Sequence, residues 1–181
     1  MTGDVRLEAD ELLQARGLLA LASDVGETFV GGSYHSDLMI WRDLDIYIRA
    51  PELSVAEYFE FGGRVAQLVD ARSASFRDNW AGAVPDLPHG LYFGIKQGDP
   101  RRGAWKLDLW ALDDADFERT RATARAFTAR LTPESRAAIL DIKAAYWVDP
   151  RYRDTVTSTM IYEAVLTAGV NTPEEFRRWL G

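Results

Sequence analysis

The stretch that decides the fold is residues 29–48, which read FVGGSYHSDLMIWRDLDIYI. From Asp43 to Ile48 this stretch alternates polar and apolar residues, a period of two that predicts a half-buried β-strand. Asp43 and Asp45 then share one face of the strand, because successive side chains point to opposite sides. Two such close carboxylates repel each other unless a cation lies between them. Proteins bind Mg²⁺ through one or two carboxylates plus substrate phosphates, so the pair predicts a site for a metal–nucleotide complex.

A glycine turn precedes this strand. Phe29 and Val30 are typical of a strand end, and Gly31-Gly32-Ser33 then predicts a tight turn, followed by a short helix from about Tyr34 to Met39. A helix N-terminus offers unpaired N–H groups to phosphate oxygens, and the serine hydroxyl adds a donor. We therefore expect Gly32 and Ser33 to bind phosphates.

His35 lies in the same predicted short helix and is a candidate for contact with a triphosphate or with leaving pyrophosphate. The alternative is an ordinary solvated histidine, which is the more frequent role of a lone loop histidine.

A third carboxylate stands in a second apolar strand, residues 104–112, which read AWKLDLWAL. Alternation places Lys106, Asp108 and Trp110 on one face of this strand. An acidic residue at the centre of an apolar strand is unusual, because an unpaired buried charge is costly. Two interpretations follow: Asp108 joins the upstream carboxylates in a catalytic site, or it is paired with Lys106 on the same face.

Together these motifs resemble the signature of the DNA polymerase β-like nucleotidyltransferase superfamily: a strand, Gly-Ser, a short helix, and a strand bearing Asp-x-Asp. The match covers residues 29–48 only. The resemblance implies that Asp43, Asp45 and Asp108 are catalytic and hold metal, with two Mg²⁺ ions expected. It also implies that Gly32 and Ser33 lie against a nucleoside triphosphate, for which we expect ATP, and His35 is a candidate for contact with the same ligand.

The resemblance is to small bacterial members, including antibiotic nucleotidyltransferases and the minimal nucleotidyltransferases of toxin–antitoxin pairs. It implies transfer of a nucleoside monophosphate to a hydroxyl of a small-molecule acceptor, with release of pyrophosphate. A nucleotidyltransferase that modifies a protein or RNA is an alternative with the same site. A catalytically degenerate nucleotide-binding or regulatory module is a second alternative. It is motivated by two departures: Asp37 stands where many members have glycine, and Arg42 where many have serine.

Composition limits the partners. The net charge of −7 disfavours long nucleic acid and favours a small cationic acceptor. The absence of cysteine excludes disulfides and thiolate metal sites. The sequence has no apolar run long enough to span a membrane and no signal-peptide pattern after Met1, so we expect a cytoplasmic location and no membrane partner.

The elements predict an α+β protein with the polymerase β-like nucleotidyltransferase fold, a mixed sheet of about five strands flanked by helices. We expect a catalytic core over residues 1–112 and a C-terminal helical subdomain over 113–181. Strands are expected at about 27–31, 43–49, 74–80, 91–96 and 104–112, with a loop at 81–88. The polar turn from Gln97 to Gly103 predicts that the last two strands pair as a hairpin. Helices are expected at about 7–23, 54–70, 114–131, 133–149, 154–168 and 173–180. Capping boxes are predicted at Ser54-Val55-Ala56-Glu57 and Thr172-Pro173-Glu174-Glu175.

Overall fold

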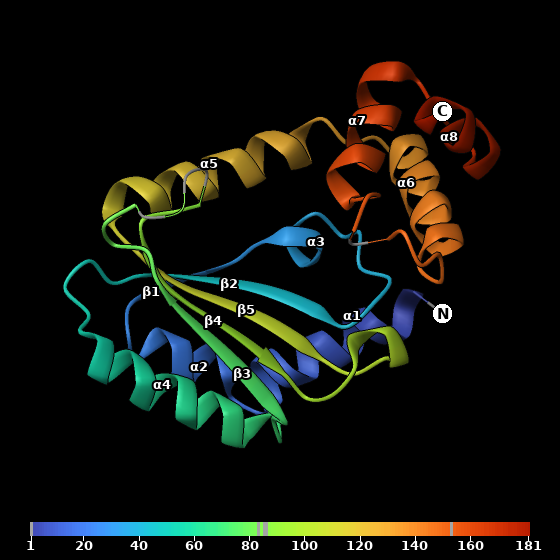
Figure 1. The fold of residues 1–181 in the computed structure, drawn as a ribbon. Coiled ribbons are helices and arrows are strands. Elements are labelled where there is room, and N and C mark those ends of the chain that lie inside the picture. The colour runs from blue at the N-terminus through green and yellow to red at the C-terminus, as the bar shows by residue number, and fades with distance from the viewer. Residues whose placement is uncertain (1, 83, 85–86, 153) are drawn as a thin grey trace. The chain divides into compact units, whose positions relative to one another are not determined.

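The computed structural model describes residues 2–82, 84, 87–152 and 154–181 (Figure 1). The loop predicted over 81–88 therefore falls partly outside the described residues. The chain divides into two compact units, Met1–Arg125 and Ala126–Gly181, and the boundary lies within a long helix, α5 (Asp114–Ala129).

The first unit is built on one five-stranded sheet. Its strands are β1 (Glu27–Val30), β2 (Asp43–Arg49), β3 (Ser73–Asp78), β4 (Gly90–Lys96) and β5 (Lys106–Leu112). Their order across the sheet is β1-β2-β5-β4-β3. The pair β2–β5 is parallel, and the other three pairs are antiparallel. The predicted α+β class and the mixed sheet of five strands are thus confirmed.

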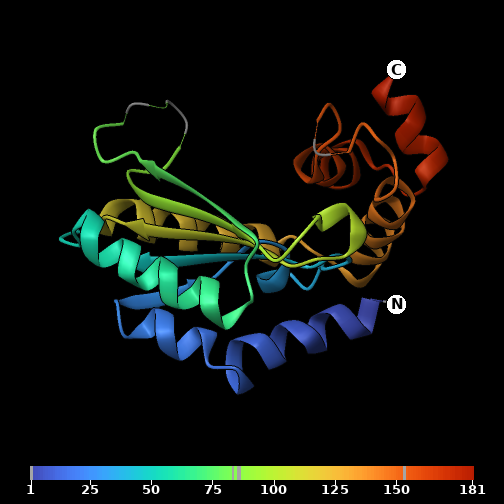
Figure 2. The same cartoon turned by 60° about the horizontal axis from the view of Figure 1, so that its bottom comes forward.

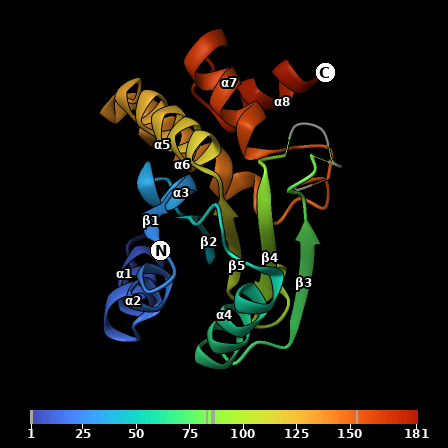
Figure 3. The same ribbon diagram turned by 90° about the vertical axis from the view of Figure 1, so that its left-hand side faces the viewer.

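Helices α1 (Thr2–Asp10), α2 (Leu18–Ser23) and α4 (Val55–Leu68) cover one face of this sheet (Figures 2 and 3). On this face the residues of β2, β4 and β5 are aliphatic or aromatic, and in β2 they are fully buried. Tyr58 of α4 is also fully buried, and its hydroxyl donates to the carbonyl of Leu109 in β5 at 2.8 Å. The alternation read from the sequence therefore places this face of β2, β4 and β5 in the core.

The opposite face of the sheet is polar near the start of β2 and β5 and aromatic further along. The aromatic part is closed by Phe117 from the first half of α5, which clusters with Trp110 and Leu112 and is 1% exposed. Asp43, Asp45, Lys106 and Asp108 lie on the polar part, because they alternate with the core residues of their strands.

The N-terminal helical region differs from the single helix expected over residues 7–23. A π-helical turn at Glu11–Ala15 follows α1, and Gly17 then breaks the helix before α2. Gly17 has φ +82°, in the left-handed region that favours glycine. The prediction of one continuous helix was therefore wrong at this interruption.

The short helix after the glycine turn also differs from the prediction of Tyr34 to Met39. Helix α3 covers Gly32–His35 and ends before Asp37, whose φ of +56° is left-handed. Leu38 and Met39 then leave the helix and become buried. The expectation was wrong in position because burial of these two side chains overrides local helix preference.

The second unit contains α6 (Pro133–Tyr146), α7 (Ser158–Ala168) and α8 (Pro173–Leu180). Thr132, the residue before Pro133, caps α6. Its side-chain hydroxyl accepts a hydrogen bond from the backbone N–H of Ser135 at 3.2 Å. Helix α7 begins at Ser158 rather than at 154, with Thr157 as its cap.

The capping box at Ser54 is present, with both reciprocal bonds to Glu57. The one predicted at Thr172 is only half formed. Thr172 accepts from the N–H of Glu175, but the Glu175 carboxylate accepts from the N–H of Asn171 instead.

Two adjacent glycines in α4 give a matched test of the packing. A Cβ on Gly63 would meet nothing within 4 Å, whereas one on Gly62 would lie 2.6 Å from the ring of Phe93. That ring is packed against Tyr58 and Phe76 and cannot yield easily. We expect Gly63→Ala to raise the free energy of unfolding by about 0.5–1 kcal/mol through helix propensity. Gly62→Ala should lower it by about 1–2 kcal/mol through overpacking.

Urea unfolding of both variants beside the wild type measures the two values. Equal effects of the same sign would contradict the packing of α4 against β4.

Candidate active site

The parallel pairing of β2 and β5 brings the predicted aspartates together. Asp45 lies directly opposite Asp108, and Asp43 lies opposite Lys106. Neighbouring strands are about 4.8 Å apart, so these four side chains form a compact square on one face. The side chains of Asp43 and Asp108 are 20% and 16% exposed. Residues more than sixty positions apart in sequence thus share one partly buried, acidic surface.

The ammonium of Lys106 lies between two of the carboxylates. Its Nζ is 3.3 Å from Oδ1 of Asp43 and donates to Oδ2 of Asp108. Burial alone would lower the pKa of Lys106, but the charges of Asp43 and Asp108 outweigh it, and the pKa is raised above the ordinary lysine value. The pairing of Asp108 with Lys106, one of the two interpretations of the sequence, is therefore present in the structure.

Tyr92 of β4 holds the other side of Asp108, a contact that the sequence reading missed. Its hydroxyl donates to Oδ1 of Asp108 at 2.6 Å. Gly94 lies opposite Asp108 on β4, and a Cβ there would lie 2.4 Å from the tyrosine hydroxyl. Burial and the bond to Asp108 raise the pKa of Tyr92, so the phenol remains a donor at neutral pH. The signal was available in the predicted hairpin, whose register places a glycine beside Asp108.

The glycine turn packs directly on Asp45. The N–H of Gly31 donates to the carbonyl of Asp45 at 2.8 Å. Gly32 has φ +55°, and a Cβ on it would lie 1.9 Å from Oδ2 of Asp45. The predicted phosphate-binding residues Gly32 and Ser33, which begin α3, are therefore next to the predicted metal-binding strand.

His35, at the end of α3, packs edge-on against Phe29 with ring centroids 5.0 Å apart. Burial, and secondarily the charge of Arg125, lowers the pKa of His35 below its ordinary value. The imidazole is therefore neutral at pH 7. Its contact with Phe29 gives it a packing role, and contact with a triphosphate stays a prediction.

Asp37, the first departure from the superfamily pattern, lies beside a cation. Its Oδ1 is 3.6 Å from Arg6 of α1, although its side chain is 73% exposed. The same arginine lies over the ring of Tyr34, 3.9 Å from its centroid. The additional negative charge expected near the phosphate site is thus partly balanced from α1.

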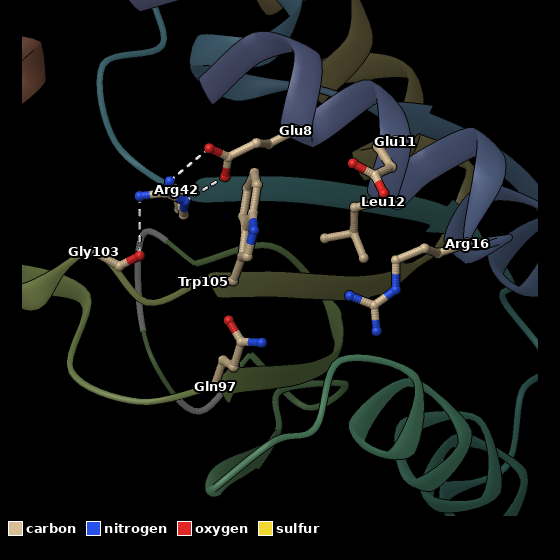
Figure 4. A pocket seen from close by; sticks show the side chains of 8 residues that line it. All are labelled: Glu8, Glu11, Leu12, Arg16, Arg42, Gln97, Gly103 and Trp105. Atoms are coloured by element: carbon tan, nitrogen blue, oxygen red, sulfur yellow. Dashed lines mark hydrogen bonds and ion pairs between the residues drawn. The ribbon is translucent and has the colours of Figure 1, made fainter. Parts of the chain in front are cut away.

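Arg42, the second departure, has a structural partner on each side. Its guanidinium pairs with both carboxylate oxygens of Glu8 at 2.5 and 2.6 Å and donates to the carbonyl of Gly103 at 3.2 Å (Figure 4). It therefore ties α1 to the loop between β4 and β5. This pairing borders a hollow of about 270 Å³ whose walls also include Trp105, Gln97 and Arg16. Trp105 belongs to the core face of the sheet, so the hollow is on the side opposite the carboxylates.

Neither tryptophan near the carboxylates offers an open stacking surface. Trp41 is 6% exposed and Trp110 is 9% exposed. The ring of Trp110 packs against Tyr92, with centroids 4.9 Å apart. Both side chains therefore have the packing role that is usual for tryptophan.

The acidic face fits a divalent cation by the chemistry of its donors. Three carboxylates on one face are hard oxygen ligands of the kind that Mg²⁺ prefers. The Lys106 ammonium held between Asp43 and Asp108 shows that a positive charge is accommodated there. Asp43, Asp45 and Asp108 are the residues that would hold such an ion.

A separate acidic group lies at the other end of β5. His89, Asp113 and Asp116 form the only group of three described residues whose candidate ligand atoms all lie within 4.8 Å of one another. Asp113 accepts from the N–H of Asp116 at 2.7 Å, and Asp116 accepts from the N–H of His89 at 2.5 Å. Asp113 and Asp116 therefore fix the start of α5, which accounts for their positions without a metal ion.

Comparison with solved structures shows the same fold in other proteins. A cytoplasmic RNA terminal U-transferase superposes with a TM-score of 0.53 at 13% identity, covering 90% of this chain and 47% of that one. A mutant of the Cid1 poly(U) polymerase bound to MgATP gives a TM-score of 0.56 at 13% identity, covering 91% and 50%. The same polymerase bound to Mg 3′-dATP gives a TM-score of 0.53 at 14% identity, covering 91% of this chain and 52% of that one. This chain thus spans about half the length of these proteins.

No protein-family model matches the sequence, and no curated protein matches it either. The matched structures are members of the polymerase β-like nucleotidyltransferase superfamily. The chain therefore has the polymerase β-like nucleotidyltransferase fold, as the motif at residues 29–48 implied. None of the helices in the described part of the chain combines the length and the apolar character needed to cross a bilayer.

The close approach of Gly32 to Asp45 can be tested by stability. Gly17→Ala serves as the control, because Gly17 also has positive φ but a Cβ there would meet nothing within 4 Å. We expect Gly17→Ala to lower the free energy of unfolding by about 1 kcal/mol through backbone strain alone. Gly32→Ala should lower it by about 1–3 kcal/mol more, because the Asp45 carboxylate must move. Denaturant unfolding measures both, and equal losses would mean that the turn does not pack on Asp45.

Proposed function

We propose that this chain is a metal-dependent nucleotidyltransferase that transfers a nucleoside monophosphate from a nucleoside triphosphate to an acceptor hydroxyl and releases pyrophosphate. The observation that carries the proposal is the position of Asp45, opposite Asp108 on the neighbouring parallel strand and in contact distance of the Gly32 turn. A metal-binding group and a phosphate-binding turn are thus adjacent in a fold shared with nucleotidyltransferases.

Each residue has a role in this proposal. Asp43 and Asp45 hold Mg²⁺, and the backbone at Gly32 and Ser33 binds the β- and γ-phosphates. When bound, divalent ions neutralise the triphosphate and lower the pKa of the acceptor hydroxyl. Asp108 accepts the proton of that hydroxyl. The hydroxyl oxygen then bonds to the α-phosphorus while the bond to the bridging oxygen breaks and pyrophosphate leaves.

Positioning and charge neutralisation account for most of the catalysis in this scheme, because phosphoryl chemistry needs little else from a protein. Tyr92 supports it by orienting Asp108 through the 2.6 Å bond to Oδ1. Oδ2 of Asp108 contacts Lys106, so both oxygens are directed by neighbours on the same sheet face.

For the nucleotide we propose ATP, and for the acceptor a small cationic molecule. The net charge of −7 supports the acceptor, because an acidic protein attracts cations and repels polyanions. The chain covers about half of the matched proteins, so their substrates need not be its own.

A second candidate function is transfer to RNA. The names of the matched structures favour it, since they describe an RNA terminal U-transferase and a poly(U) polymerase. In this candidate function the nucleotide substrate is UTP instead of ATP. The acidic net charge opposes this candidate, because binding to the RNA backbone is usually driven by basic residues.

Thermal unfolding with Mg²⁺ and each of the four nucleoside triphosphates tests the nucleotide site. Ligand at about a hundred times its dissociation constant adds about 2.7 kcal/mol. For a chain of this size we expect a rise in Tm of about 5–10 °C with ATP. The rise should vanish in Asp43→Asn/Asp45→Asn and without Mg²⁺.

Asp24→Asn is the matched control, since it makes the same chemical change at a side chain that is 70% exposed in another part of the first unit. It should keep the full rise. If no nucleotide raised the Tm of the wild type, the degenerate module would replace this proposal. A rise with UTP alone would favour the RNA candidate.

The acceptor is tested with α-³²P-labelled nucleotide, first with a set of aminoglycoside-like amines and then with short RNA. We expect label on a small molecule and none on RNA. In the reaction so identified, Asp108→Asn should lower kcat about a hundredfold or more, because a positioned base contributes that much. Full turnover of Asp108→Asn would remove Asp108 from the catalytic site.

A further inference from the structure

The positive charge of Lys106 is the feature of the acidic face that the proposed function does not use, since only its contact with Asp108 enters there. Its side chain is 23% exposed, and its Nζ lies between Asp43 and Asp108, which are themselves largely buried. These ion pairs differ from ordinary surface ion pairs, because all three side chains are less than a quarter exposed on the same sheet face.

The backbone fixes the lysine in this place. Lys106 is two residues before Asp108 in β5, so both side chains point to the same face. Its strand register places it directly opposite Asp43 in β2. The N–H of Lys106 also donates to the carbonyl of Arg42 at 3.0 Å. The ammonium therefore stays within reach of the carboxylates whenever these two strands are paired.

The charges on this face determine how many further cations it can take. Within the square of four side chains, Asp43, Asp45 and Asp108 carry three negative charges, and Lys106 removes one of them. One divalent ion neutralises the remainder. A second divalent ion between Asp43 and Asp108 would meet the lysine ammonium at close range, and like charges repel strongly in a partly buried site.

We propose that Lys106 is a resident cation that takes the place of one of the two divalent ions, so that the site binds a single divalent ion at Asp43 and Asp45. The inference rests on the proposed function and specifies its metal requirement. The superfamily resemblance implies two divalent ions. In this chain the Lys106 ammonium replaces one of them. Lys106 is here a positioning residue for Asp108, and it supplies charge to the site.

Titration with Mn²⁺ alone, followed by the electron paramagnetic resonance signal of the free ion, counts the sites. Asp43→Asn/Asp45→Asn gives the background from the rest of the acidic surface, including His89, Asp113 and Asp116. Above that background we expect one Mn²⁺ per chain for the wild type and two for Lys106→Met. Lys106→Arg, which keeps the charge, should bind one.

Lys96→Met is the matched control. Lys96 is opposite Lys106 in the register of β4 and β5 but is exposed at the end of its strand. This variant should bind one Mn²⁺, like the wild type. Two ions in the wild type, or one in Lys106→Met, would overturn the inference while leaving the nucleotide site intact. No Mn²⁺ above background in any variant would overturn the proposed metal site, and the inference with it.

Loss of the lysine also leaves Asp43 and Asp108 without their shared cation, so Lys106→Met should have a lower Tm than the wild type in the presence of chelator. Mn²⁺ should then raise the Tm of Lys106→Met more than that of the wild type. An equal rise in the two proteins would show that the lysine only stabilises the fold and does not occupy a cation position.

Discussion

The parallel pairing of β2 with β5 is the constraint on which the rest of the first unit depends. A shift of one residue would move every side chain of a strand to the opposite face. The core face resists such a shift, because Leu44, Ile46, Leu107 and Leu109 are all fully buried. Burial of these aliphatic side chains therefore sets the position of Asp45 opposite Asp108. The geometry of the polar face is a consequence of packing on the other side of the same strands.

Much of this arrangement could be predicted from the sequence, because it is local. The alternation from Asp43 to Ile48 predicted both the strand and the face of its aspartates, and the polar turn before residue 104 predicted the hairpin of β4 and β5. The partner of a strand across sixty residues is not a local property. The contact of Tyr92 with Asp108 depends on that long-range register and on the absence of a side chain at Gly94. The roles of the site residues in catalysis stay predictions.

The polar face also shows how three carboxylates can be held close together in a folded chain. Removing like charges from water is costly unless each is paired or hydrogen-bonded. Asp108 has Tyr92 on one oxygen and Lys106 on the other, and Asp43 shares the same lysine. The neighbours that lower this cost also fix the orientation of the carboxylates. A site arranged in this way needs little reorganisation when a substrate arrives, which is the usual condition for electrostatic catalysis.

The two departures from the superfamily pattern have a common explanation in the N-terminal helix. Asp37 lies 3.6 Å from Arg6, and Arg42 pairs with Glu8, so both substitutions face α1. Positions 37 and 42 contact α1 in this protein. A protein with a different segment, or no segment, in the place of α1 would have other side chains at these two positions. The departures therefore have a reason in packing that is independent of catalysis. These two departures were the reason to consider a degenerate module. They are now a weaker reason, because neither residue replaces a carboxylate of the acidic face.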